Sequence, residues 1–220
     1  MYTDLVFPKN NEIEFIKTAE LLNYGSLCFL YTLEDFEKRK SLEYPTNLKI
    51  FSAIICAKKQ LQKAKKLSPF VIVESEEDDR NTLEQLSPDV MYNFEKASIK
   101  NTIKQKYSGI NNIYADIMHA NNIMILFSLQ KIKKNDDIYL GRIMQNIMLA
   151  QKHKIDIITA TFADSPLAMR NPKDIISLFI TLGMNEATAK KSLSNAYSRY
   201  MQNQSKKQGK IIADGIEEMN

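Results

Sequence analysis

The sequence predicts an α/β fold, a TIM-like (β/α) barrel in a single domain over residues 1–220 with a short C-terminal tail at about 202–220. Apolar strand-like runs alternate with amphipathic helical runs almost throughout the chain, which indicates parallel βαβ units. The strand-like runs are nearly continuous in apolar residues, as in strands that are covered on both faces. Seven or eight such units fit in 220 residues, which is within the usual size of this barrel.

Seven segments have the length and composition of buried strands. They are expected at residues 4–7, 26–31, 48–57, 69–74, 88–94, 122–129 and 154–162. An open doubly wound sheet is the alternative arrangement for such strands. However, the chain's six glycines include no G-x-G-x-x-G or Walker-type spacing.

Helices are expected between these strands, and several have recognisable ends. The first begins near Glu12 with Asn11 as its N-cap and ends at Gly25. Further helices are expected at 33–42 after a Thr32 cap, around residue 60, near residue 83, at 111–120 and at 139–153. Asn171 and Asn185 are each expected to cap one of the last two helices.

Composition narrows the class of protein without identifying it. The net charge is +4, from 30 basic and 26 acidic residues, which is too mild to establish a nucleic-acid binder. Lysine clusters such as "AKKQLQKAKK" and "QSKKQGK" are, taken alone, most simply the solvated faces of helices. With only Cys28 and Cys56, no signal-like N-terminus and no long apolar run, we expect a cytoplasmic protein with no membrane association.

The residues that usually carry catalysis are sparse. His119 and His153 stand in no H-x-H or H-E-x-x-H spacing, and each is interpreted as a helix-surface residue. Asp116, Asp156 and Asp164 match no metal-binding motif. We therefore expect no catalytic and no metal-ligating residue in this chain, although an enzyme that uses aspartates remains an alternative.

The segment "ADSPLAMRNPKD", residues 163–174, follows the last strand, where an α/β enzyme would carry its chemistry. Its two prolines fix a loop that presents Arg170 beside the helix beginning at Pro172. Backbone N–H groups at such a helix start attract anions, and an arginine adds a directed fork for phosphate. The alternative is an ordinary surface arginine that caps a neighbouring carbonyl.

Two longer stretches, residues 106–129 and 140–194, resemble the protein component 3 family of ribonuclease P, in its archaeal form. The family pattern is a basic residue before a small-Gly-Ile/Leu-Asn/Asp turn, an apolar strand ending near Phe-Ser, a helix with an arginine, and Arg-x-Pro-Arg/Lys-Asp. The matching positions here are Lys106, Gly109, Asn111, Asn122, Phe127, Ser128, Arg142, Arg170, Pro172, Lys173, Asp174, Gly183, Met184, Ala189 and Lys190. The first half of the chain agrees only in its order of strands and helices.

The resemblance implies an accessory protein subunit of ribonuclease P, the endonuclease that removes the 5′ leader of precursor tRNA. In that family the RNA and its bound Mg²⁺ perform the cleavage, so no cofactor bound by this chain is expected. The implied partners are the ribonuclease P RNA, the small ferredoxin-like protein component 2, other ribonuclease P proteins and, indirectly, precursor tRNA.

By the same resemblance, the RNA-binding positions are Arg170, Arg142, Lys106, Lys173 and Lys190. Family members often carry Arg, His or Lys where this chain has Gln105, Asn112 and Asn121, so the RNA face is expected to differ. Two alternatives stay open. One is a metal-dependent phosphoesterase of the polymerase and histidinol phosphatase type, and the other is a protein scaffold that does not contact RNA.

Overall fold

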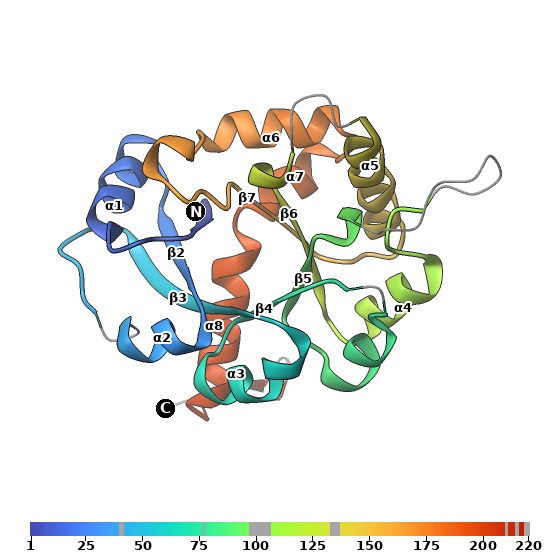
Figure 1. Ribbon diagram of the computed structural model, residues 1–220, viewed down its shortest axis with the longest axis horizontal. Helices are drawn as coiled ribbons and strands as arrows, with labels where there is room; N and C mark the ends of the chain where they lie inside the picture. Colours follow the sequence, from blue (N-terminus) through green and yellow to red (C-terminus); the bar gives the residue numbers. More distant parts are fainter. Residues whose placement is uncertain are drawn as a thin grey trace.

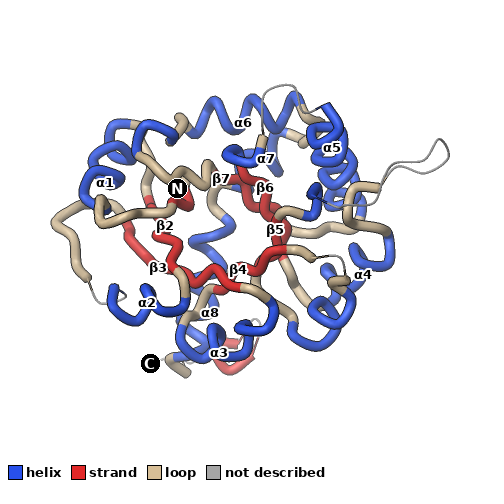
Figure 2. Tube along the Cα trace, viewed as in Figure 1, coloured by secondary structure: helices blue, strands red, loops and turns tan. Residues whose placement is uncertain are grey.

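The computed structural model describes residues 1–39, 42–76, 78–96, 107–132, 137–209, 211–213 and 216–217. Within them, seven parallel strands form one sheet in chain order, and helices surround it (Figures 1 and 2). The strands are β1 (Thr3–Val6), β2 (Ser26–Tyr31), β3 (Lys49–Cys56), β4 (Val71–Glu74), β5 (Val90–Tyr92), β6 (Met124–Ser128) and β7 (Ile157–Ala160). This arrangement confirms the predicted TIM-like barrel.

The ring closes between the last strand and the first. Val6 and Ala163 form a parallel bridge, the N–H of Phe7 donates to the carbonyl of Ala163 at 2.8 Å, and the N–H of Phe162 donates to the carbonyl of Leu5 at 3.1 Å. Because the segment after β7 pairs directly with β1, the described barrel has seven strands, at the lower end of the seven or eight units that were predicted.

Helices and short helical turns connect the strands. The helices are α1 (Glu12–Leu21), α2 (Leu33–Arg39), α3 (Leu61–Leu67), α4 (Asn112–Ala120), α5 (Asp137–Lys152), α6 (Pro172–Thr181), α7 (Glu186–Ser192) and α8 (Asn195–Lys207). The turns are η1 (Lys58–Gln60), η2 (Thr82–Leu86), η3 (Phe94–Lys96), η4 (Leu129–Lys131) and η5 (Pro166–Ala168). Two short strands, β8 (Ile211–Ala213) and β9 (Ile216–Glu217), pair antiparallel near the C-terminus. None of the helices in the described ranges is both long and apolar enough to cross a bilayer.

Two apolar layers stabilise the barrel. One lies between the ring and its helices and includes Phe15, Leu61 and Phe179. The other fills the ring, where Leu30, Phe51 and other strand residues pack together. Burying apolar side chains on both sides of the sheet is what near-continuous apolar strands require.

Helix α8 covers the amino ends of the strands. Its Tyr197 and Tyr200 pack on Phe51, with ring centroids 5.6 and 4.6 Å away. Its Asn203 donates from Nδ2 to the carbonyl of Pro69 at 2.8 Å, just before β4. Because α8 runs to Lys207, residues 202–207 of the expected tail belong to a packed helix.

The helix caps were predicted in part. Asn171 and Asn185 cap α6 and α7, since their Oδ1 atoms accept from the N–H groups of Lys173 at 2.9 Å and Thr188 at 2.8 Å. The cap of α1 was wrong, because the side chain of Asn11 accepts from the N–H of Lys9 instead.

The predicted end of α1 was also wrong. The helix ends at Leu21, four residues before Gly25, and Asn23 takes the left-handed conformation with φ of 60°. Asparagine tolerates this conformation better than most residues, so no glycine is needed to stop the helix.

Candidate nucleic-acid interface

Arg170 lies in the loop between η5 and α6, and this loop packs against the first part of the chain. The hydroxyl of Tyr24 donates to the carbonyl of Arg170 at 2.8 Å, and η5 contacts α1. The exposed Arg170 side chain donates from Nη1 to the carbonyls of Leu167 at 3.0 Å and Met169 at 2.8 Å. It therefore caps its own loop, while Nε and Nη2 bond to no residue in the described part of the chain.

The start of α6 does not offer free backbone amides. Asn171 accepts from the N–H of Lys173 through its side chain, and from the N–H groups of Asp174 and Ile175 through its carbonyl. The expected backbone anion site at this helix start is therefore wrong, because the N-cap already uses these donors. What remains for an anion here is the Arg170 guanidinium and the exposed ammonium of Lys173.

Arg142 has a structural contact as well as a partly exposed side chain. From α5 it donates through Nη1 to the carbonyl of Glu95 at 2.8 Å, which ties α5 to η3. The Glu95 carboxylate is buried and accepts from Asn146 Nδ2 at 2.8 Å, and the same Nδ2 donates to the carbonyl of Ser108 at 2.9 Å. Burial raises the pKa of Glu95 to about 7, although the Asn146 bond and the Arg142 charge oppose the rise.

Sequence reasoning missed this group of Arg142, Glu95, Asn146 and Ser108. Asn146 and Glu95 are 51 residues apart in the chain, so no local spacing relates them. The signal that was present is the position of Asn146 on the buried stripe of α5, where a polar residue needs a partner.

The other predicted RNA-binding positions are dispersed. Lys190 on α7 is exposed and pairs with Glu186, with 2.5 Å between Nζ and Oε1. Lys106 lies outside the described residues. In Figure 1, α6 lies on the side of the ring between α1 and α5. The structure thus places Arg170 and Lys173 together, and places Arg142 and Lys190 on other helices.

The predicted absence of a metal-binding motif was examined in the described residues, where no group of three or more His, Cys, Asp or Glu side chains is positioned to hold a metal ion. The three aspartates noted from the sequence have separate basic neighbours, which are His153 for Asp116, Lys191 for Asp156 and Lys9 for Asp164.

His153 lies between two helices rather than on an open helix surface. Its ring contacts Asp116 Oδ1 at 2.7 Å and Asn112 Oδ1 at 2.9 Å, and its side chain is only 12% exposed. The interpretation of His153 as a surface residue was therefore wrong, because the ring joins the end of α5 to α4.

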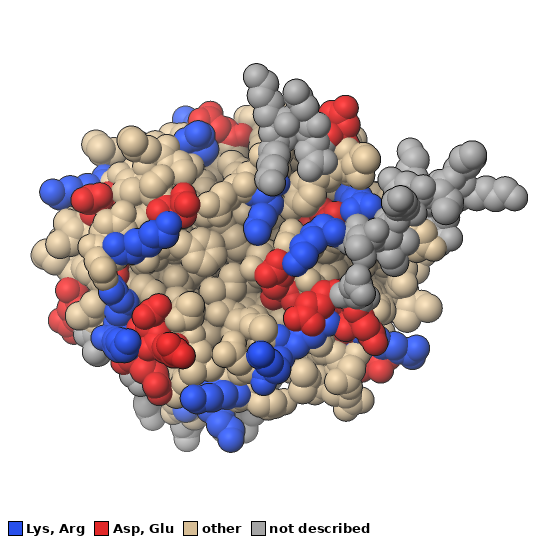
Figure 3. All heavy atoms as spheres, in the orientation of Figure 1, with Lys and Arg blue, Asp and Glu red and all other residues tan. Residues whose placement is uncertain are grey.

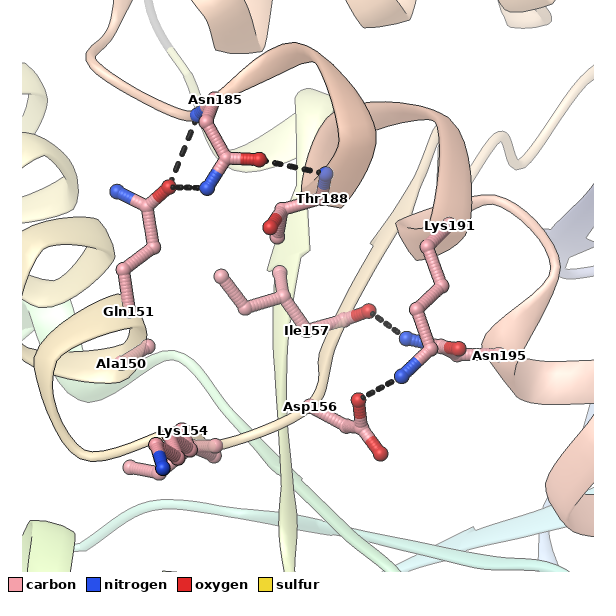
Figure 4. A pocket seen from close by; sticks show the side chains of 10 residues that line it. Ala150, Gln151, Lys154, Asp156, Ile157, Asn185, Thr188, Lys191 and Asn195 are labelled. Carbon is pink, nitrogen blue, oxygen red and sulfur yellow. Dashed lines mark hydrogen bonds and ion pairs between the residues drawn. The ribbon is translucent and has the colours of Figure 1, made fainter.

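A cavity of about 300 Å³ lies between α5, α7 and the start of β7 (Figure 4). Its polar walls are largely paired: Gln151 Oε1 accepts from the side chain of Asn185 at 2.7 Å, and Lys191 bonds Asp156 at 2.6 Å. The cavity lies at the amino end of β7, whereas barrel enzymes place their chemistry at the carboxyl ends of the strands. Its position and its paired walls do not favour an active site.

Charge does not single out one side of the barrel in the view of Figure 3. Basic and acidic side chains alternate around the rim of that face, and uncharged side chains cover most of its middle. A binding role for particular arginines and lysines therefore depends on their individual positions.

Comparisons with known proteins relate this fold to others. No family model matches the chain. One similar chain comes from a cryo-EM structure of archaeal ribonuclease P with mature tRNA, with a TM-score of 0.77, 19% sequence identity and coverage of 98% of both chains. Another comes from a crystal structure of an uncharacterized protein, with a TM-score of 0.51, 6% identity and coverage of 98% of this chain and 77% of that one. The chain therefore shares its complete barrel fold, from end to end, with a chain of the archaeal ribonuclease P structure.

Proposed function

We propose that this chain is a protein subunit of ribonuclease P that binds and stabilises the catalytic RNA for removal of the 5′ leader of precursor tRNA. The observation that carries the proposal is the agreement of two likenesses. The residues of the second half resemble ribonuclease P protein component 3, and the fold is similar over 98% of both chains to a chain of an archaeal ribonuclease P structure. The fold likeness also covers the first half, where the residues carry no motif.

The physical basis of the proposal is electrostatic. A folded RNA packs phosphates closely, and arginine or lysine side chains that are held in place neutralise them with release of counterions. Arg170 suits this task because its loop is fixed by the Tyr24 bond while Nε and Nη2 still have donors for a phosphate. Such a role requires no nucleophile and no metal ligand from the protein.

The same proposal specifies partners. We propose that the chain works in the cytoplasm with the ribonuclease P RNA, with the ferredoxin-like protein component 2 and with further ribonuclease P proteins. Precursor tRNA is then contacted indirectly, through the assembled complex. Cleavage is assigned to the RNA with its Mg²⁺, and this chain is assigned none of the bond breaking.

Reconstitution tests the proposal. Cognate ribonuclease P RNA, protein component 2 and this chain are combined with a 5′-labelled precursor tRNA, and each component is omitted in turn. We expect leader release to require the RNA and to increase when the chain and component 2 are both present. The chain alone is expected to release no leader.

Two outcomes would contradict the proposal. Chelator-sensitive hydrolysis of a generic phosphoester by the purified chain would favour the metal-dependent phosphoesterase. Stimulation of cleavage with crosslinks to component 2 but none to RNA would favour a protein scaffold within the same complex.

A further inference from the structure

Helices α3 and α8 lie side by side at the amino end of the barrel, as Figure 1 shows. The ammonium of Lys207 donates to the carbonyls of Lys65 at 2.8 Å and Ser68 at 2.9 Å, so the C-terminus of α8 meets the C-terminus of α3. Asn203 adds a bond from its Nδ2 to Asp89 Oδ1 at 2.6 Å. The two helices therefore present one continuous surface, which we name the α3–α8 surface.

The α3–α8 surface has an unusual composition. Residues 58–70 and 194–209 contain no Asp and no Glu. Their basic residues are Lys58, Lys59, Lys63, Lys65, Lys66, Arg199, Lys206 and Lys207. The chain as a whole is nearly balanced, with 30 basic and 26 acidic residues. This surface is therefore a local concentration of positive charge within a mildly basic protein.

Acidic neighbours from other elements offset only part of this charge. Lys58 pairs with Asp79, with 2.8 Å between Nζ and Oδ1. Asp89 attracts Lys65, Arg199 and Lys207, and burial raises the pKa of its carboxyl against these charges and its hydrogen bonds. One further carboxylate thus serves three cations.

The outer row of lysines is not offset. Lys59, Lys63 and Lys66 are exposed, and none forms an ion pair with a residue in the described ranges. Their spacing of four and then three residues places them on one face of the η1–α3 segment. Figure 3 shows a group of basic side chains at the lower edge of the molecule, where α3 lies in Figure 1.

The helix dipole does not account for this row. Lysines in the last turn of a helix are stabilised by the partial negative charge there, which explains Lys65 and Lys66 in α3. Lys59 precedes α3 and Lys63 is its third residue, so both lie at the end where the dipole disfavours cations. Their placement calls for an anion from outside the chain.

We propose that the α3–α8 surface, through Lys59, Lys63 and Lys66, binds the phosphate backbone of RNA as a second contact, apart from the Arg170 loop. The inference rests on the proposed function, since it assumes that the chain works on RNA. RNA suits the surface better than an acidic protein does, because protein interfaces are depleted in lysine and are built around aromatic or apolar anchors. Phosphate contacts read no sequence, so the surface is expected to bind structured RNA through its backbone.

The test compares two double variants with the same change in charge. Lys63→Gln with Lys66→Gln removes two charges from the surface, and Lys17→Gln with Lys38→Gln removes two exposed lysines from α1 and α2. Binding is measured by fluorescence anisotropy with a short RNA duplex of arbitrary sequence over a series of salt concentrations. Poly-glutamate is the competing acidic polymer, and circular dichroism confirms that both variants fold.

We expect the K63Q/K66Q protein to bind the duplex about tenfold more weakly at roughly 0.1 M salt and to lose about two from the salt slope, one per phosphate contact. The K17Q/K38Q protein is expected to bind like the wild type. Equal effects of the two variants, or tighter binding of poly-glutamate than of RNA, would overturn the inference. If the wild-type chain binds no RNA at all, the proposed function fails with it, whereas equal effects leave that function standing.

Discussion

The carboxylate of Asp4 in β1 accepts from the backbone N–H of Thr161 at 2.8 Å and from the Thr161 hydroxyl at 2.7 Å, and so joins the first strand to the residue after the last one. Its Oδ1 also accepts from the N–H of Leu5 at 2.9 Å. A side chain thus supplies hydrogen bonds at the seam where the barrel closes. Because Asp4 is completely buried, its charge makes the seam sensitive to pH.

The first prediction concerns this seam. Burial raises the pKa of Asp4 from 3.8 to about 6, against the hydrogen bonds from Thr161 and Leu5. Because the folded state binds the proton more tightly than the unfolded state, this contribution to stability is complete below about pH 4 and is lost as pH rises to about 6. The loss amounts to about 3 kcal/mol.

Asp4→Asn keeps an oxygen for the two backbone N–H groups and cannot titrate. We expect its urea midpoint, compared with that of the wild type, to improve as pH rises from about 4 to about 7. Asp4→Ala is expected to lose stability at every pH, since two buried N–H groups lose their acceptor. Parallel pH profiles for the wild type and Asp4→Asn would contradict this assignment.

The second prediction concerns two glycines with opposite surroundings. Gly109 has φ of +90°, and a Cβ there would lie 2.1 Å from the carbonyl oxygen of Phe94. Gly109→Ala must therefore move backbone, and we expect it to lower the free energy of unfolding by about 2 kcal/mol or more. Gly141, inside α5, has open space around it, so Gly141→Ala is expected to raise stability by about 0.5–1 kcal/mol. Thermal unfolding of both variants tests the pair, and a neutral Gly109→Ala would be inconsistent with the close approach.

The third prediction concerns the buried amide of Asn146. Asn146→Ala leaves Glu95 Oε1 and the carbonyl of Ser108 without this donor, and we expect a loss of about 2 kcal/mol or more in the free energy of unfolding. Met148→Ala on the same helix is the control, because Met148 is 61% exposed and its loss is expected to stay below about 0.5 kcal/mol. Chemical denaturation gives both values, and similar losses for the two variants would argue against a role for Asn146 beyond helix formation.

The fourth prediction separates Arg170 from an ordinary surface arginine. Arg80 is its matched control, since it is exposed and pairs only with Glu84 of the next helical turn. We expect Arg170→Ala to weaken binding to the ribonuclease P RNA and to reduce the salt slope by about one, while Arg80→Ala changes neither. Arg170→Lys is expected to restore the slope but not the full affinity, because an ammonium lacks the arginine fork. Indistinguishable binding by Arg170→Ala and Arg80→Ala would remove Arg170 from the RNA contacts.

Much of the fold could be predicted because the apolar runs of the strands are short, regular and bounded. Strand β2 was placed at its observed limits, and the other six strands were placed within about three residues at each end. The closure at Asp4 and Thr161 could not be predicted, because it joins residues 157 positions apart. Ile180 was expected in the buried stripe of α6 but is 39% exposed, since the stripe ends with Phe179.

The candidate site was predictable only where its residues are local. The Arg170 loop and its Asn171 cap follow from two prolines and an N-cap within eight residues. The α3–α8 surface could not be predicted, because the lysines of α3 and the end of α8 are far apart in the chain and meet through Lys207. The signal in the sequence was the absence of acidic residues from both segments.

The central claim is that positive side chains fixed on the barrel support an RNA that performs the cleavage. The most direct measurement is the Mg²⁺ concentration for half-maximal leader release by the cognate RNA with component 2, with and without this chain. The account predicts that the wild-type chain lowers this concentration and that the Arg170→Ala, Arg142→Ala double variant largely loses the effect. An unchanged Mg²⁺ requirement with the wild-type chain, or full activity of the double variant, would contradict it.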